Sequence, residues 1–374
     1  MPEYWFNYGV TEVSMEVPEE ISQRKLDFKQ SGIDEAIWHR LRSFAEEVLS
    51  EAGGGGIAIL YDYVEEDLSL SILKHLIESF IEEEAGERIT LLTTCWRLYQ
   101  ANRMEHLGRS LKKYGISIKA IDASKTEKTY FHGVEVSKQF LDASARIVIT
   151  SSELHGLLES ASIKEALILG GALNLEFGGD LGDSIKSAWE EIAGRLPFYA
   201  VTTVNEEIYF GEAEKVESEV SGVLRSKFVI PVEDAEIIIM GGGGHPRDST
   251  LQNVLHLLGL LKDSVVEGGL IGIIAECKDG LGSDSFLESL LKGGGRGLER
   301  GLIELAKEVA EEKRVAFTTS LPKSILKDLL NIRGFDAPQE LLTYSLRIYS
   351  RNARLLISDK PKIKPIRSRT PERS

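Results

Sequence analysis

The sequence predicts an α/β protein with two doubly wound domains, and three observations support this fold class. Short apolar runs typical of buried strands alternate with amphipathic helical stretches, which is the pattern of parallel sheets covered by helices on both faces. The length of 374 residues is too great for one typical hydrophobic core. The 42% of hydrophobic and 28% of charged residues lie in the ordinary globular range. We therefore expect two domains that face each other across a cleft.

The first predicted domain spans residues 1–230 and ends in a β-hairpin. Its predicted parallel strands lie at 57–60, 89–94, 116–121 and 146–151. A helix with apolar residues three and four positions apart is predicted at 68–84. Within 198–210, two β-rich runs flank Asn205 and Glu206, and this pattern predicts a hairpin that closes the domain.

The second predicted domain spans residues 231–358, and a basic tail follows at 359–374. The predicted strands lie at 236–240, 270–275, 315–319 and 355–357, with helices at 249–262, around 283–313 and at 321–350. The tail carries six Lys or Arg and three Pro against two acidic residues. It has no periodicity, so we predict a flexible terminus, with a docked tail or a contact with a polyanion as the alternatives.

Composition excludes several classes of protein. A net charge of −15 argues against nucleic acid or an anionic membrane as the main partner. Cys95 and Cys277 are the only cysteines, too few for a disulfide framework or a thiolate metal site, and we predict no metal site. The start of the chain lacks a basic segment before an apolar one, and the longest apolar run, 270–275, is far too short to span a bilayer. These features predict a cytoplasmic protein.

A glycine-rich turn between a predicted strand and a predicted helix is the most distinctive segment. Its glycines are Gly241, Gly242, Gly243 and Gly244. Backbone N–H groups of such a turn can approach an anion closely at the start of a helix, and Asp248 closes the turn. Pro246 stands where a dinucleotide fingerprint needs glycine, and no Walker sequence follows. The turn is equally consistent with a tight connection whose helix is capped by Asp248 or Ser249.

A second polar, glycine-containing segment, ECKDGLGS at 276–283, follows the next predicted strand. In an open parallel sheet, ligands bind beyond the carboxyl ends of the strands. We therefore expect the turn 241–248 and the segment 276–283 to lie side by side.

The strings GGGGHPRDSTLQ and EGGLIGIIAECKDGLGSDSF together resemble the C-terminal domain of the nickel-pincer lactate racemase family. The resemblance spans roughly residues 235–358, and the N-terminal half follows the family in order and spacing. It implies an isomerase of the racemase or epimerase type, with a nickel-pincer nucleotide and a small-molecule ligand in the interdomain cleft. It also implies that Gly241 to Gly244 and Asp248 contact the cofactor.

Position by position, the resemblance implies both retained and lost functional residues. Asp62 and Arg97 are retained as cofactor-binding positions. Glu65 stands in place of an arginine that would hold the substrate carboxylate, and a carboxylate there repels such a substrate. Trp96 stands in place of an acid–base histidine, and indole cannot transfer protons in that role.

Further along the chain, His155 matches the second acid–base histidine, and Lys164 matches the lysine that bonds the cofactor. Gln252 is retained as a substrate-binding position, whereas leucine replaces both the tyrosine before it and the lysine after it. No histidine lies between His155 and His245, where the family supplies its nickel ligand. The residues also have ordinary explanations: His155 as a hydrogen-bonded strand-end residue, Lys164 as a solvated helix residue, and Gln252 as support for a helix cap.

Three functional hypotheses follow. The first is a diverged isomerase of a hydroxy acid or sugar acid that uses a different ligand set. The second is a non-catalytic relative that binds a small ligand or a partner, and the third is an enzyme of another reaction class. Racemization of lactate by the family's own chemistry is not expected.

Overall fold

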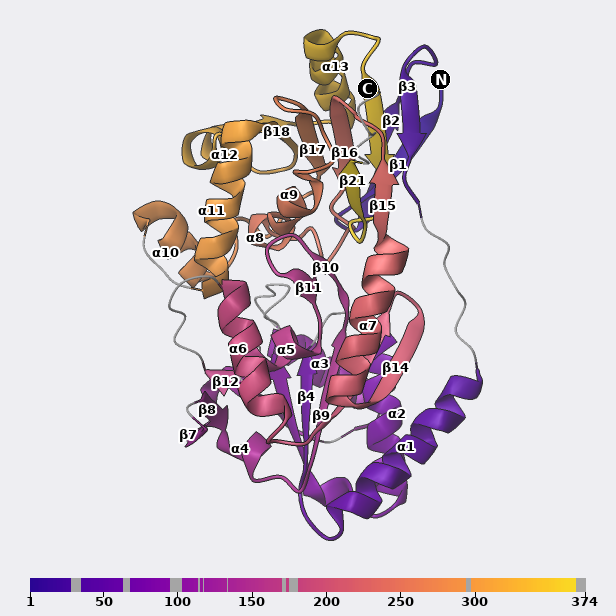
Figure 1. The fold of residues 1–374 in the computed structure, drawn as a ribbon, viewed down its shortest axis with the longest axis vertical. Helices are drawn as coiled ribbons and strands as arrows, with labels where there is room; N and C mark the ends of the chain where they lie inside the picture. Colours follow the sequence, from indigo (N-terminus) through magenta and orange to yellow (C-terminus); the bar gives the residue numbers. More distant parts are fainter. Residues whose placement is uncertain are drawn as a thin grey trace, which may run out of the picture. The chain divides into compact units, whose positions relative to one another are not determined.

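The structure of the chain, a computed structural model, forms two compact units, each built around a six-stranded sheet (Figure 1). Unit 1 comprises Met1–Phe28, Leu154–Glu159 and Arg225–Ser374, and unit 2 comprises Lys29–Glu153 and Ser160–Leu224. The structure describes residues 1–27, 35–62, 68–94, 103–113, 115–116, 118–132, 134–169, 173–174, 181–293 and 297–367. The predicted α/β class with parallel sheets and flanking helices is confirmed.

The sheet of unit 2 is parallel except at one edge. Its strands run in the spatial order β14-β13-β9-β4-β5-β6, and β14 is antiparallel to β13. Their bounds are β4 Ile57–Asp62, β5 Ile89–Thr94, β6 Ala120–Asp122, β9 Ala145–Ser151, β13 Tyr199–Val204 and β14 Glu207–Glu212. The β13–β14 pair is the predicted hairpin, and it turns at Asn205, which tolerates the left-handed φ of 59° found there.

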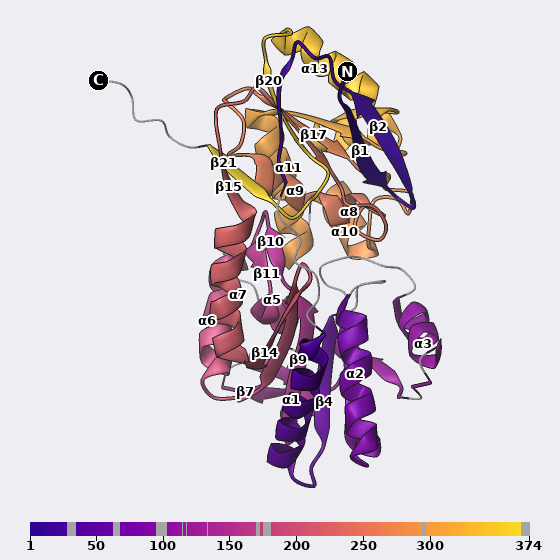
Figure 2. The same ribbon diagram turned by 90° about the vertical axis from the view of Figure 1, so that its right-hand side faces the viewer.

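Helices α1 (Ala36–Ala52) and α2 (Leu68–Glu82) pack against one face of this sheet (Figure 2). Phe44 and Phe80 of these helices share one core cluster with Ile59 of β4. The other helices are α3 Arg103–Lys113, α4 Lys138–Leu141, α5 Ile163–Leu169, α6 Leu181–Ala193 and α7 Ala213–Phe228, with short 3-10 turns η1 Gly86–Arg88 and η2 Ala123–Lys125. A small sheet has the order β12-β8-β7, with bounds Leu173–Asn174, Val134–Ser137 and Lys128–Phe131.

The sheet of unit 1 is parallel throughout, in the order β19-β18-β17-β16-β20-β3. Its strands are β3 Ser22–Lys25, β16 Ile237–Gly241, β17 Leu270–Ile274, β18 Arg314–Thr318, β19 Arg333–Phe335 and β20 Arg354–Ser358. The central strands are apolar at every position because both faces are covered. Helix α13 (Pro338–Tyr349) and the hairpin β1 (Glu3–Tyr8)–β2 (Thr11–Glu16) share one core cluster with these strands.

Five more helices complete unit 1: α8 Leu251–Val254, α9 His256–Leu261, α10 Asp284–Lys292, α11 Gly297–Glu312 and α12 Lys323–Leu330. The single helix predicted at 249–262 is therefore two short helices that meet at Leu255. Within the described ranges, every helix falls short of the length and apolar character that a membrane-crossing helix needs.

The compact units differ from the predicted domains at the start of the chain. The sequence predicted that residues 1–230 form one domain, but Met1–Phe28 belongs to unit 1, where Gln23 of β3 pairs with Leu355 of β20. Strand β3 has the polar sequence SQRK and lies at the sheet edge. Such a strand lacks the apolar run by which buried strands are recognised, so local sequence gave no sign of this pairing.

The basic tail also differs in part from its prediction. Residues Lys364–Arg367 form β21, which pairs in parallel with β15 (Val229–Val232), and Ile363 before it is buried. The alternative of a docked tail therefore holds up to Arg367. Residues 368–374 lie outside the described part of the chain.

Strands β10 (Glu153–His155) and β11 (Glu159–Ala161) flank a short excursion of the chain from unit 2 into unit 1. Gly156 lies against α9 so closely that a Cβ atom there would stand 1.9 Å from the carbonyl oxygen of His256. A Cβ atom at Gly259 would stand 2.2 Å from the carbonyl oxygen of Gly156. Contact between the two backbones therefore requires glycine on both sides.

We predict that Gly156→Ala lowers the free energy of unfolding by about 1–3 kcal/mol or more, because the new methyl group meets backbone atoms that cannot rotate away. Urea unfolding followed by circular dichroism would measure this change. The matched control is Gly54→Ala, where an added Cβ atom meets nothing within 4 Å. Equal stabilities for the two variants would contradict the close approach.

Candidate functional site

Two loops meet at the carboxyl edge of the unit 1 sheet, as the sequence predicted. The amide of Cys277 donates to the carbonyl oxygen of Asp248 at 2.8 Å, and the amide of Asp279 donates to that of Ser249 at 2.8 Å. The predicted proximity of the turn 241–248 and the segment 276–283 is thereby confirmed. Strands β17, β18 and β19 lie on one side of β16, whereas β20 lies on its other side. The strand order therefore reverses between β16 and β20, and open α/β sheets bind ligands at such a topological switch point.

The glycines of this turn pack against other segments of the same unit. A Cβ atom on Gly241 would lie 3.1 Å from the carbonyl oxygen of Asp359, and one on Gly243 would lie 2.8 Å from Pro361 Cγ. A Cβ atom on Gly244 would lie 2.9 Å from the Cβ atom of Asn7, in the β1–β2 hairpin. The glycines therefore allow the chain termini to pack over the switch point, which is a structural use of the motif.

Asp248 joins three segments of unit 1 through hydrogen bonds. Its Oδ2 atom accepts the amide of Gly9 at 2.8 Å and the amide of Glu276 at 3.2 Å. Its side chain is fully buried, and burial raises the pKa of the carboxyl group while these backbone donors oppose that rise. The carboxylate predicted to contact a cofactor is therefore engaged with backbone amides.

Gln252 and the helix cap are likewise engaged inside unit 1. The amide of Ser283 donates to Gln252 Oε1 at 2.8 Å, which ties α8 to the segment 276–283. The N-cap of α8 is Thr250, whose hydroxyl accepts the amide of Asn253, and not Asp248 or Ser249 as predicted. The reason is that the Asp248 carboxylate is held by other amides, while the Ser249 hydroxyl donates to the carbonyl oxygen of Pro246 at 2.9 Å.

Sequence reasoning did not find the contribution of the N-terminal hairpin to this edge. Gly9 lies so close to Glu276 that an added Cβ atom would meet the carboxylate oxygen.

Burial, with Cys277 and Glu276 adding to it, raises the pKa of Tyr8 to about 12. Burial also raises the pKa of the Cys277 thiol to about 12, so this cysteine stays protonated and is a poor nucleophile at neutral pH.

His155 lies in the excursion into unit 1 and stacks on His256 of α9. The ring centroids are 4.5 Å apart, the planes are inclined by 7°, and both side chains are buried. The amide of Leu157 donates to His155 Nδ1 at 3.3 Å, so this nitrogen acts as an acceptor. If the two histidines acted as an acid–base pair, they would have to lie on opposite faces of one substrate carbon. Each ring approaches such a carbon to about 3–3.5 Å, so the two rings would have to stand about 6–7 Å apart. The stacked pair leaves no room for a substrate carbon between its rings.

Asp62 lies at the switch point of the other sheet, between β4 and β9 of unit 2, among buried hydroxyl groups. Thr150 of β9 donates its hydroxyl hydrogen to Asp62 Oδ2 at 3.0 Å. On the opposite face of the sheet, the Thr203 hydroxyl donates to Ser151 Oγ at 2.8 Å. The hydroxyl of Thr93, on β5, is buried and has no hydrogen-bond partner among the described residues. We define the polar edge as Asp62, Thr93, Thr150, Ser151 and Thr203, which lie at the carboxyl ends of four neighbouring strands. Asp62 and Thr150 are on one face of the sheet, and the other three residues are on the opposite face.

Lys164 lies between two carboxyl groups of unit 2. Its Nζ atom stands 3.6 Å from Glu165 Oε1 and 3.7 Å from Glu217 Oε1. The amide of Ser162 donates to Glu165 Oε2 at 3.0 Å, which forms half of a capping box at the start of α5. Glu217 reaches the same helix start from α7 and accepts the amide of Ile163 at 3.2 Å. The Lys164 side chain is therefore paired within a structural cluster.

Burial raises the pKa of Glu165 to about 7, and the neighbouring Glu217 carboxylate adds to the rise, whereas Lys164 opposes it. The Ser162 hydroxyl lies 2.5 Å from Glu165 Oε2 and 2.9 Å from Glu217 Oε1, but its one hydrogen serves a single carboxylate at a time. A proton on Glu165 relieves the repulsion between the two acids. This cluster therefore takes up a proton near neutral pH.

Some predicted positions lie outside the described residues. These are Arg97, Trp96 and Glu65. Of the predicted site residues that are described, Asp248, Gln252 and the four glycines come together in unit 1. His155 also belongs to unit 1, where it stacks on His256, a residue that was not predicted. Asp62 and Lys164 belong to unit 2.

Comparison with known proteins supports the fold and no closer relationship. No family model matches the sequence, and no curated protein matches it. The chain is similar in structure to the lactate racemase apoprotein from Thermoanaerobacterium thermosaccharolyticum, with a TM-score of 0.75 and 16% sequence identity. The match covers 98% of this chain and 100% of that chain. At this identity the likeness establishes a shared fold.

The described residues do not fit the nickel-pincer nucleotide that the resemblance implies. The lysine that would bond the cofactor, Lys164, has its Nζ atom 3.6 Å from Glu165 Oε1 and 3.7 Å from Glu217 Oε1, so two carboxyl groups of the chain already engage it. Within the described ranges, no three His, Cys, Asp or Glu side chains gather as metal ligands. We therefore assign no reaction step to this cofactor.

We predict that the free energy of unfolding falls as pH rises from about 4.5, the ordinary pKa of a glutamate, to about 7, the raised value of Glu165. In this window the folded protein holds a proton that the unfolded chain has released, so rising pH favours unfolding. Urea unfolding over this pH range would measure the slope attributable to Glu165.

The Glu165→Gln variant should show a flatter dependence than the unmodified protein. Glu190→Gln, at an exposed position on α6, is the control and should leave the slope unchanged. An identical slope in the Glu165→Gln variant would show that Glu165 does not hold the proton.

Proposed function

We propose that this chain is a diverged lactate racemase-like protein that binds a small hydroxy acid or sugar acid and does not racemise lactate by nickel-pincer chemistry. The pairing of Lys164 with Glu165 and Glu217 carries the second half of this proposal. To bond a cofactor, the Lys164 Nζ atom would have to leave the buried carboxyl groups of Glu165 and Glu217.

The first half of the proposal is supported by the polar edge of unit 2. Hydroxy acids and sugar acids present hydroxyl donors, and Asp62 with its neighbouring hydroxyls offers acceptors at a switch point, where ligands bind in α/β sheets. The unpartnered Thr93 hydroxyl is significant, because a buried hydroxyl without a partner costs about 1–3 kcal/mol. A ligand hydroxyl would satisfy it.

We expect Asp62→Asn to weaken binding of such a ligand by about 10-fold to 100-fold, because it replaces one of the two acceptor oxygens with an amide donor. A panel of hydroxy acids and sugar acids would be screened by ligand-observed NMR, and hits measured by calorimetry. Asp142→Asn, an exposed substitution of the same kind in unit 2, is the matched control.

Thr93→Val separates binding from folding. It removes an unpartnered buried hydroxyl, so it should raise the unfolding temperature while it weakens binding. A panel without any hit, or hits indifferent to both Asp62→Asn and Thr93→Val, would refute this binding site.

The second candidate is an isomerase of another hydroxy acid or sugar acid, and the match of His155 to an acid–base histidine by resemblance favours it. The Leu157 amide donates to His155 Nδ1, which fixes the orientation of the imidazole ring. Redox-type racemization needs a hydride acceptor, so this candidate requires a cofactor of another kind. Interconversion of the two epimers of a ligand that is lost in His155→Gln would favour the isomerase over the binding protein.

We predict that lactate racemization is undetectable after co-expression with the pincer-synthesis enzymes, and that nickel is not bound stoichiometrically. Loss of one acid–base group alone lowers rates by about 10²–10⁴-fold, and Trp96 replaces one such group by resemblance. Chiral chromatography of D- and L-lactate and elemental analysis are the measurements. Lactate racemase from Thermoanaerobacterium thermosaccharolyticum, treated identically, is the positive control, and comparable turnover by this chain would overturn the proposal.

A further inference from the structure

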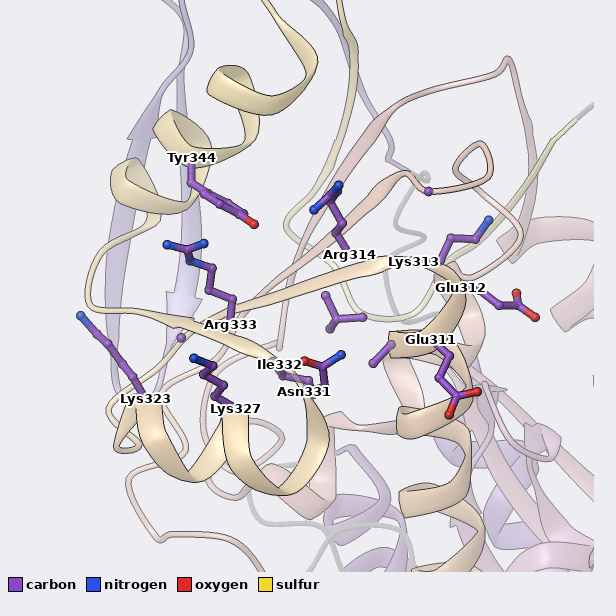
Figure 3. Close-up of a pocket in the computed structure, with 14 residues that line it drawn as sticks. Glu311, Glu312, Lys313, Arg314, Lys323, Lys327, Asn331, Ile332, Arg333 and Tyr344 are labelled. Atoms are coloured by element: carbon purple, nitrogen blue, oxygen red, sulfur yellow. The ribbon is translucent and has the colours of Figure 1, made fainter.

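A pocket of about 730 Å³ lies within unit 1, at the amino ends of β17, β18 and β19. It is therefore on the edge of the sheet opposite to the segments 241–248 and 276–283. Its size falls in the range of about 300–1,000 Å³ typical of small-molecule sites. The ends of α11 and α12, the starts of β18 and β19, and Tyr344 of α13 form its walls (Figure 3).

The lining is strongly basic. Its charged side chains are Lys313, Arg314, Lys323, Lys327 and Arg333 against Glu311 and Glu312. In Figure 3 the two glutamates point away from Lys327 and Arg333. The excess of three positive charges contrasts with the net charge of −15 for the whole chain. A basic concavity on an acidic protein concentrates anions locally.

The partial negative charges at two helix C-termini offset only part of the positive charge of the lining. Helices α11 and α12 both end at the pocket, and each C-terminus carries about half a negative charge from its carbonyl groups. Lys313 is already engaged within the chain, since its Nζ atom donates to the carbonyl oxygen of Val266 at 3.1 Å. Two helix ends offset about one positive charge, so the lining remains positive.

Two of the basic side chains are available for a ligand. Lys323 pairs with Asp336, whereas no carboxylate among the described residues pairs with Lys327 or Arg333. Arg333 is held by aromatic contacts: its guanidinium carbon lies 4.2 Å from the ring centroid of Tyr344 and 5.7 Å from that of Phe335. A stacked guanidinium keeps its in-plane N–H donors free, in the fork geometry that matches phosphate oxygens.

We propose that this pocket binds a small organic phosphate or pyrophosphate, with Arg333 and Lys327 as its principal contacts. A phosphate ester or pyrophosphate presents several oxygens to the Arg333 fork and a second charge to Lys327. The volume accommodates a group larger than inorganic phosphate. The pocket belongs to unit 1 and the polar edge to unit 2, so this proposal stands or fails independently of the proposed function.

Isothermal titration calorimetry with sodium pyrophosphate, at constant ionic strength, tests the proposal. Binding should be saturable, and Arg333→Gln and Lys327→Gln should each weaken it by about 10-fold or more, the usual loss for a charge-assisted hydrogen bond. Arg333→Lys should also weaken it, because lysine keeps the charge but loses the fork. Asp336→Asn should strengthen binding, since it releases Lys323.

The control is Lys307→Gln, an exposed lysine of α11 outside the pocket, which removes the same charge and should leave pyrophosphate affinity unchanged. Circular dichroism would verify that all variants are folded. An undetectable interaction with pyrophosphate, or a loss of affinity in Lys307→Gln equal to that in Arg333→Gln, would overturn the proposal. It would also be overturned if a single-stranded oligonucleotide bound through Arg333 while pyrophosphate did not.

Discussion

The buried carboxylate of Asp248 is the interaction on which the carboxyl edge of unit 1 depends. One carboxylate oxygen accepts hydrogen bonds from the amide of Gly9, in the N-terminal hairpin, and from the amide of Glu276, just after β17. The carbonyl oxygen of Asp248 accepts a third hydrogen bond, from the amide of Cys277. Without these acceptors, the amides of the buried residues Gly9 and Cys277 would lack a partner, at a cost of about 1–3 kcal/mol each. Segments more than two hundred positions apart in sequence therefore share one acceptor.

The two sheets make different use of equivalent positions. At the switch point of unit 1, glycines allow Asn7, Asp359 and Pro361 to pack where an open sheet would receive a ligand. At the switch point of unit 2, the strands end in hydroxyl groups and Asp62. Backbone packing closes the first position, whereas side chains with hydrogen-bonding capacity line the second. The motif that is most conspicuous in the sequence therefore serves packing in the described structure, whereas hydrogen-bonding side chains gather at the other switch point.

Local patterns predicted the elements whose causes are local. Apolar runs located the buried strands β5 and β16 closely, and Asn205 marked a hairpin that the structure confirms. Patterns could not reveal what a residue meets across the fold. The glycines at 241–244 signalled a close approach, but whether a ligand or Asn7 makes that approach depends on the hairpin. Likewise, Lys164 was recognisable as a lysine near a helix start, but Glu217 reaches it from a helix about fifty positions later.

The pairing of β3 with β20 affects the order in which the chain can fold during synthesis. The strand pair Gln23 and Leu355 joins the first and last parts of the chain, so β3 leaves the ribosome long before its partner exists. Contacts of such long range are slow to form, because the loop between them must close first. The polar sequence of β3 suits this delay, since an apolar strand left unpaired for most of translation would invite aggregation.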